Sequence, residues 1–407
     1  MIPTKSIFWI RASLINLCIV ALYGVVMRYK IGFEFPFFNQ KYLQEAHSHF
    51  AFAGWITQSL FFLIIGVFRS NLDSIREKTY SWLLLINLVS AYGMLICFSI
   101  QGYGAFSLFF STLSVITGYV FSWFALKDAG RLAKTHPSKN WIKAAIWFGI
   151  LSTFGTMVLS FMMATHHFDQ TTYLGSIYFY LHFQYNGWFL FACMGLFLDK
   201  IKNVIPLSGM LRNSFWLFFL AGIPSYFLST LWANLPAWLY GLVILAAVFQ
   251  VIGWWLFLRV LFNYRTTLKS LFPKPALMLM LIIGASLTIK LLLQLGSTIP
   301  AISNLAFGFR PIVIAYLHLV LLVIISLFIL NFMFVNQLLQ YNKRTTIALI
   351  VFTGAIILNE TVLCVQGVAA FSYTVIPYAD QMLFGVALLI FSSIVLLLYA
   401  QFRHTIR

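Results

Sequence analysis

Residues 311–334 read PIVIAYLHLVLLVIISLFILNFMF, a run that contains no charged side chain and one histidine, His318. At about 1.5 Å per residue, a helix over this run is about 36 Å long, which is enough to cross the roughly 30 Å hydrocarbon core of a bilayer. A spanning helix also satisfies its own backbone polar groups, which lipid cannot do. The run therefore predicts a transmembrane helix.

The composition of the whole chain points the same way. Of its 407 residues, 61% are hydrophobic and 9% are charged, whereas an ordinary soluble domain is about 25% charged. This balance also excludes a disordered chain, which needs low hydrophobicity and high net charge. The formal net charge of +17 does not indicate a nucleic-acid partner, because basic residues in a very apolar chain usually fix its orientation in a membrane.

The rest of the sequence repeats such apolar runs about twelve times. The runs are Ile7–Met27, His47–Phe68, Tyr80–Ile100, Tyr103–Leu126, Trp141–Ala164, Tyr173–Phe197, Ser214–Leu231, Leu235–Phe262, Pro275–Leu295, Pro311–Phe334, Thr345–Phe371 and Tyr378–Gln401. We therefore expect an all-α polytopic membrane protein with about twelve transmembrane helices. The connections are short, so residues 1–407 are predicted to form one integral-membrane helical bundle domain in the lipid bilayer.

The basic residues predict the orientation of these spans. Nearly all of the 26 Lys and Arg residues fall in alternate connections on one side, which should be the cytoplasmic side. The other side carries only Arg28, Lys30, Lys41 and Arg310, and Lys290 lies within a run. An even number of spans then places both termini in the cytoplasm, as expected for a multi-pass protein of the inner, cytoplasmic membrane.

Six of the eight histidines are expected in the outer half of this bundle. They are His47 and His49 at the start of the second run, His166 and His167 after the fifth, His182 in the sixth and His318 in the tenth. Neutral imidazole is the commonest metal ligand in proteins, and helix bundles build cofactor sites from facing helices. All six are candidate metal ligands. The alternatives are helix–helix hydrogen bonds for the buried histidines and plain surface positions for the others.

Helical geometry limits these roles. His47 and His49 are two residues apart, so they point about 200° apart around a helix and cannot face one centre. In the sixth run, His182, Tyr185 and Asn186 share a face, where hydrogen bonds could fix the tautomer of the imidazole.

Two charged residues are also predicted within the membrane. Lys290 lies in the ninth run and Glu360 in the eleventh. They could form an ion pair with each other. Alternatively, Glu360 could carry protons or orient a metal-bound histidine. We take His182, Tyr185 and Glu360 as the candidate catalytic residues.

Three short motifs, together with the span count, resemble the haem–copper oxidase subunit I superfamily, which includes the nitric oxide reductases. The motifs are HSHFAFAGW at residues 47–55, LHFQYNGW at 181–188 and AYLHL at 315–319. The resemblance implies a low-spin b-type haem held by His47 or His49 together with His318. It also implies a second metal, copper or non-haem iron, for which His182 with His166 and His167 is the candidate site.

The chain departs from the family pattern at three places. The tenth run has one histidine, whereas the family usually has two. The seventh run, Ser214–Leu231, lacks the adjacent histidine pair that binds the non-haem metal. Asn186 stands where the oxidases have a tyrosine four residues after the sixth-span histidine.

These observations lead to one main functional hypothesis and two rivals. The main hypothesis is a divergent haem-binding membrane protein that transfers electrons or, if it is an enzyme, reduces oxygen or nitric oxide. Its expected partners are an electron-donor protein or a quinol, and further membrane subunits. The rivals are a twelve-span secondary transporter and a non-catalytic haem- or copper-binding sensor or assembly subunit.

Overall fold

A computed structural model describes residues 4–303, 309–340 and 342–402, and this part of the chain is helical without any strand. The helices gather into two compact units. Unit 1 comprises Met1–Gly66, Leu72–Phe121 and Ser326–Arg407, and unit 2 comprises Val67–Asn71 and Ser122–Ile325, in each case within the described residues. The single bundle domain expected from the sequence stays a prediction.

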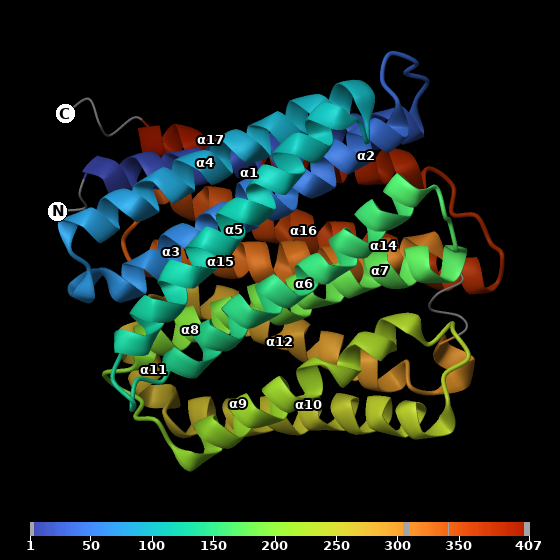
Figure 1. Cartoon of the computed structure of the whole chain (residues 1–407). Coiled ribbons are helices and arrows are strands. Elements are labelled where there is room, and N and C mark those ends of the chain that lie inside the picture. The colour runs from blue at the N-terminus through green and yellow to red at the C-terminus, as the bar shows by residue number, and fades with distance from the viewer. Residues whose placement is uncertain (1–3, 304–308, 341, 403–407) are drawn as a thin grey trace. The chain divides into compact units, whose positions relative to one another are not determined.

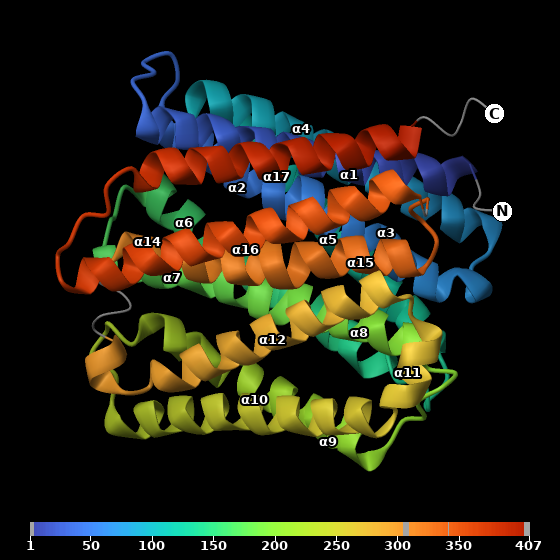
Figure 2. The same ribbon diagram turned by 180° about the vertical axis from the view of Figure 1, so that it is seen from behind.

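Unit 1 is built around its first and last helices, which pack along each other (Figures 1 and 2). α16 packs on α17, and α2 with the segment η1 fits against α1 and α4. The elements of unit 1 are α1 (Thr4–Gly32), α2 (Gln40–His49), η1 (Phe50–Thr57), α3 (Gln58–Phe68), α4 (Ser74–Gln101), most of α5 (Ala105–Arg131), α15 (Leu327–Val335), α16 (Lys343–Phe371) and α17 (Ala379–Phe402).

Unit 2 combines one long interrupted helix with a group of three helices in which α10 contacts both α9 and α12. α6 packs along the interrupted helix α7–η3–α8, α9 packs on α10, and α10 packs on α12. The elements are α6 (Lys139–Thr165), α7 (Gln170–His182), η3 (Phe183–Phe189), α8 (Leu190–Ile201), α9 (Gly209–Gly222), η4 (Pro224–Thr230), α10 (Ala237–Asn263), α11 (Arg265–Leu271), α12 (Lys274–Gly296), α14 (Arg310–His318) and η5 (Leu319–Ser326).

Ten helices of the described chain are long and apolar enough to cross a membrane, and they correspond to ten of the predicted runs. The run Tyr173–Phe197 lies within the interrupted helix α7–η3–α8, which is not among these ten helices. The run Ser214–Leu231 is divided between α9 and the 3₁₀ segment η4, which begins at Pro224. Proline has no N–H to continue an α-helix, so the division falls at this residue. The chain is a helical, multi-pass membrane protein.

α4 shows how such a helix suits lipid. Large apolar side chains are exposed along one face at Trp82, Leu85, Val89 and Ile96, a spacing of three, four and seven residues. The opposite face is buried and includes the polar Asn87. A soluble helix would expose its polar face, so this pattern indicates that lipid covers the outer face.

The second membrane helix begins earlier than predicted. Asn39 caps it by accepting hydrogen bonds from the backbone N–H groups of Lys41 and Tyr42, so the helix starts at Gln40. The predicted start at His47 is wrong because the first two turns are polar and hydropathy overlooks them. As a result, His47 and His49 lie about two turns inside the helix.

Candidate functional site

Three helices change from α to π winding immediately after a histidine predicted to be in the site. η1 follows His49, η3 follows His182 and η5 follows His318. The part of the chain that the structure describes shows π winding in no other element. Stretches of π-helix are rare and occur frequently at functional sites. The winding therefore singles out the same three helices as the histidines do.

Two of these junctions also share a sequence pattern that the analysis of the sequence missed. HFAFAGW at residues 49–55 and HFQYNGW at 182–188 both have the form His-Phe-x-aromatic-x-Gly-Trp. A Cβ atom on Gly54 would lie 2.7 Å from Cε2 of Phe50, and one on Gly187 would lie 2.6 Å from Cβ of Phe148. Each glycine thus leaves space for a phenylalanine. Aligning the chain with itself would have revealed this recurrence.

Buried amides bind the backbone of η1. Asn16 of α1 donates from Nδ2 to the Gly54 carbonyl at 2.5 Å, and Asn87 of α4 donates to the Ala53 carbonyl at 3.1 Å. Asn16 in turn accepts a hydrogen bond from the Tyr92 hydroxyl at 2.9 Å. Both asparagines are almost fully buried. The irregular backbone is therefore held by side chains from the two neighbouring helices.

His47 carries an unsatisfied ring nitrogen. Its Nδ1 atom is buried and has no hydrogen-bond partner. The ring lies against α1, where a Cβ atom on Gly24 would be 3.9 Å from its Cε1 atom. Buried polar atoms in proteins are nearly always paired, and an exception calls for an explanation such as a missing ion or ligand.

His49 faces another direction and has partners in unit 1. Its Nε2 atom is 3.1 Å from the Tyr103 hydroxyl, and its ring stacks on Phe98 at a centroid distance of 4.3 Å. His47 thus faces α1 while His49 packs against α4. This confirms the prediction that the two side chains cannot face one centre.

His182 is almost completely buried, and both of its ring nitrogens are engaged. Nε2 is 3.0 Å from the carbonyl of Gly222, and Nδ1 is 3.2 Å from Nδ2 of Asn186. A carbonyl can only accept, so Nε2 carries the hydrogen and Nδ1 accepts from the Asn186 amide. The predicted role of Asn186 in fixing the tautomer is confirmed. For His182 to bind a metal, one of these two bonds would have to break.

His166 and His167 are exposed at the end of α6, where His166 ends the helix in the left-handed conformation with φ of 53°. Among the described residues, no three or more His, Cys, Asp or Glu side chains lie close enough together to hold a metal ion. The structure thus does not assemble His166, His167 and His182 into such a group. The second metal stays a prediction.

His318 ends α14, directly before η5. Its Nδ1 atom is 2.9 Å from the Ile314 carbonyl one turn earlier, so Nδ1 is the donor. Metal-binding histidines commonly donate one ring N–H to a carbonyl in this way, which fixes the orientation of the ring. His318 belongs to unit 2 and His47 to unit 1, and their pairing on one haem stays a prediction.

The other two candidate catalytic residues lie in different units. Tyr185 in η3 is buried, hydrogen bonds with Ser229 and lies with its ring 6.3 Å from that of Tyr316. Glu360 lies in α16 of unit 1, where its Oε1 atom accepts a hydrogen bond from Asn359 at 3.0 Å. Lys290 lies in unit 2, and its predicted ion pair with Glu360 stays a prediction.

We compared the chain with models of protein families and with curated proteins. No family model and no curated protein matched the chain.

Proposed function

We propose that this protein binds a b-type haem in the membrane and is a divergent relative of haem–copper oxidase subunit I. The observation that carries the proposal is the change from α to π winding directly after His49, His182 and His318. These are the three helices in which the sequence resembles the histidine-bearing helices of that family. The winding and the sequence resemblance thus point to the same three helices, which supports the proposal.

His47 suits a haem ligand better than His49 does. The His47 ring hydrogen bonds with the Val20 backbone, and its buried Nδ1 atom has no partner, whereas His49 contacts Tyr103 and Phe98. A neutral imidazole is a common axial ligand of haem iron. We therefore infer that His47 would hold the haem iron, and the second ligand expected from the sequence, His318, stays a prediction. When bound, the haem would supply one-electron transfer.

The proposal includes twelve spans with both termini in the cytoplasm. The ten apolar helices account for ten spans, and α7–η3–α8 and α9 with η4 would be the other two. The helix Gln170–Ile201 would be about 48 Å long, which is enough to span. Arg11, near the start of α1, donates to the Gln401 carbonyl near the end of α17 at 3.4 Å. The two terminal helices therefore meet at one end of unit 1, which supports an even number of crossings.

The test is a visible absorption spectrum and haem extraction from the purified protein. We expect a Soret band, and reduced-state α and β bands typical of a six-coordinate b-type haem. His47→Leu should abolish or greatly weaken haem binding, whereas His49→Leu should retain it. His318→Leu tests the second ligand and should change the coordination state. His167→Leu is the matched control because this histidine is exposed.

A colourless protein with normal yield and helicity, expressed with ample haem, would overturn the proposal. A coloured protein whose spectrum is unchanged by His47→Leu would overturn the ligand assignment. Turnover of oxygen and nitric oxide with a quinol donor, together with iron and copper analysis, separates an enzyme from a non-catalytic haem protein.

A further inference from the structure

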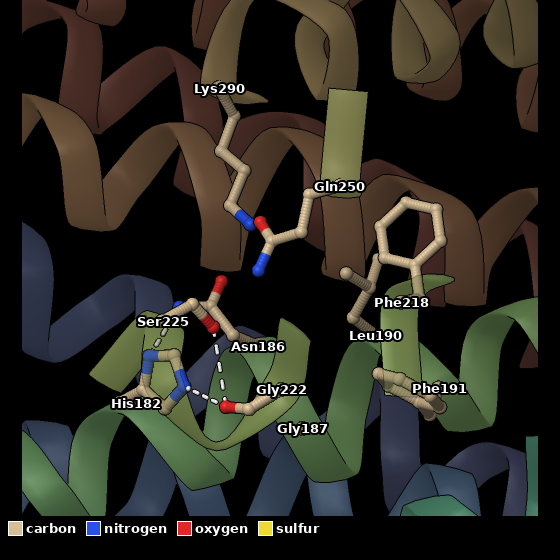
Figure 3. Close-up of a pocket in the computed structure, with 10 residues that line it drawn as sticks. All are labelled: His182, Asn186, Gly187, Leu190, Phe191, Phe218, Gly222, Ser225, Gln250 and Lys290. Atoms are coloured by element: carbon tan, nitrogen blue, oxygen red, sulfur yellow. Dashed lines mark hydrogen bonds between the residues drawn. The ribbon is translucent and has the colours of Figure 1, made fainter. Parts of the chain in front are cut away.

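Unit 2 contains a small polar pocket beside the buried His182 (Figure 3). Its polar lining comes from four elements: α7 with η3, η4, α10 and α12. The side chains that matter are His182, Asn186, Gln250 and Lys290. The volume in which the centre of a water molecule fits is about 10 Å³. This is room for about one water molecule.

Lys290 brings a positive charge into this pocket. It is 1% exposed and lies in the C-terminal third of the membrane helix α12. No hydrogen bond or ion pair of Lys290 occurs among the described residues. A charged side chain inside a membrane protein is costly unless polar groups compensate it, so it is expected to serve a function.

The pocket presents two oxygen atoms that lack donors. Asn186 donates from Nδ2 to His182, and its amide also hydrogen bonds with Tyr316. Its Oδ1 atom is buried without a hydrogen-bond partner. Oε1 of Gln250 is also buried without a partner. Figure 3 shows Gln250 beside the end of Lys290, with Asn186 facing them from the other wall of the pocket.

We propose that the pocket is a hydration site in which one buried water molecule and these two amide oxygens solvate the Lys290 ammonium. The water oxygen accepts from Lys290, and its hydrogens reach Asn186 Oδ1 and Gln250 Oε1. The water and the two amides then offer acceptors for the three N–H groups of the ammonium. A buried water typically makes about three hydrogen bonds, which is the number this site provides. Lys290 is thereby held as a fixed positive charge without a carboxylate.

The competing occupant is a small anion that neutralises Lys290. The size of the free space and the orientation of Asn186 favour water, because an amide oxygen would face the anion. The site requires no haem, so its test is independent of the function proposed above.

The experiment is solid-state nuclear magnetic resonance of the full-length protein in lipid, labelled with ¹⁵N at lysine Nζ. Lys290→Met assigns the Lys290 signal by its disappearance. We expect the chemical shift of an ammonium and magnetisation transfer to its protons from a water that exchanges slowly with bulk. Asn186→Leu should reduce this transfer strongly. Gln294→Met is the matched control, because Gln294 is a buried amide on the same helix that does not line the pocket.

Three outcomes would overturn the proposal: a neutral-amine shift, an ammonium without transfer from bound water, or an equal loss of transfer in Asn186→Leu and Gln294→Met. The measurement is repeated with chloride replaced by bromide. An unchanged Lys290 signal supports water, and a shifted signal would assign the pocket to an anion instead. Circular dichroism and size exclusion confirm that each variant is folded before its spectrum is interpreted.

Discussion

At the scale of single residues, glycines decide how closely the aromatic side chains can pack beside the π segments. Gly187 faces Phe148 of α6, and Gly54 makes room for Phe50 within its own helix. Neither position has a positive φ, so the requirement is space and not backbone conformation. A methyl group at either position would have to displace a buried ring.

Gly187→Ala should therefore destabilise the protein. The added Cβ atom would lie 2.6 Å from Cβ of Phe148, which cannot swing away as the end of a flexible chain could. Overpacking of this kind costs about 1–3 kcal/mol. Thermal unfolding in detergent, followed by tryptophan fluorescence, measures the loss. Gly241→Ala in α10 of the same unit is the control, because no atom lies within 4 Å of its added Cβ atom, and its stability should stay equal or rise. Equal midpoints for the two variants would show that the contact between residue 187 and Phe148 does not limit stability.

A second prediction concerns acid. Asp199 lies 2.8 Å from Lys202 and 3.5 Å from Nε2 of His136. Burial alone would raise the pKa of the Asp199 carboxyl, but the hydrogen bonds from His136 and Lys202 outweigh burial and hold this pKa below its ordinary value. A lowered folded-state pKa gives stability that is present above the unfolded value of about 3.9 and is lost as the pH falls through the folded value.

Asp199→Asn removes this titration. We expect the wild-type protein to lose stability more steeply than Asp199→Asn as the pH falls below about 4, with parallel behaviour between pH 5 and 7. Unfolding midpoints across this range in a detergent without ionisable groups provide the measurement. Parallel curves down to pH 3 would show that the hydrogen bonds of the Asp199 carboxylate do not stabilise the folded protein.

At the scale of elements, the π segment η1 depends on its neighbours. Asn16 and Asn87 donate to the adjacent carbonyls of Gly54 and Ala53 from two different helices. The α-helical ladder is interrupted here, and the two amides add side-chain donors to carbonyls in a region without water; the Ala53 carbonyl also accepts from the Gln58 backbone N–H.

Replacing either asparagine by leucine should remove a buried side-chain hydrogen bond to the backbone of η1 and cost about 1–3 kcal/mol. The loss of stability in the double variant should differ from the sum of the two single losses, because the two carbonyls are adjacent and share one segment. Ser90→Ala is the control: Ser90 bonds only to the Ile86 carbonyl of its own helix, so its loss should be small. Unfolding midpoints of the wild type and the four variants test this, and additive small effects would contradict the role given to the asparagines.

The sequence predicted the existence of the elements much better than their details. Hydropathy located ten membrane helices because one long apolar run suffices to specify each, as in Pro311–Val335. It missed the polar start of α2 at Gln40, where the cap Asn39 sets the boundary. It also predicted the separate directions of His47 and His49, since these follow from helical angle alone. The pocket around Lys290 could not be predicted, because it joins residues from seven elements that only tertiary packing brings together.

At the scale of the whole molecule, the distribution of basic residues predicts the orientation in the membrane. We predict that the α1–α2 connection faces outward and the α5–α6 connection faces the cytoplasm. Phe37, which is 80% exposed, and Thr135, which is exposed, mark the two connections.

Cysteine labelling tests this prediction in a background that lacks the four native cysteines. Phe37→Cys should react with a membrane-impermeant maleimide in intact spheroplasts, whereas Thr135→Cys should react only after the membrane is opened. The reverse pattern would mean the opposite orientation, and equal labelling of both would contradict a fixed one.

The three π segments have a geometric consequence for the helices that contain them. A π turn bonds residue i to i+5, so it accommodates one more residue than an α turn. One extra residue corresponds to a rotation of about 100° around the axis. The side chains beyond each segment thus face a different neighbour from the one that an unbroken helix would present them to. A single helix can in this way point its histidine toward one neighbour and the side chains of its other half toward another. Deleting one residue from η1 or η3 would remove this rotation, so the side chains of one half would point in the wrong direction.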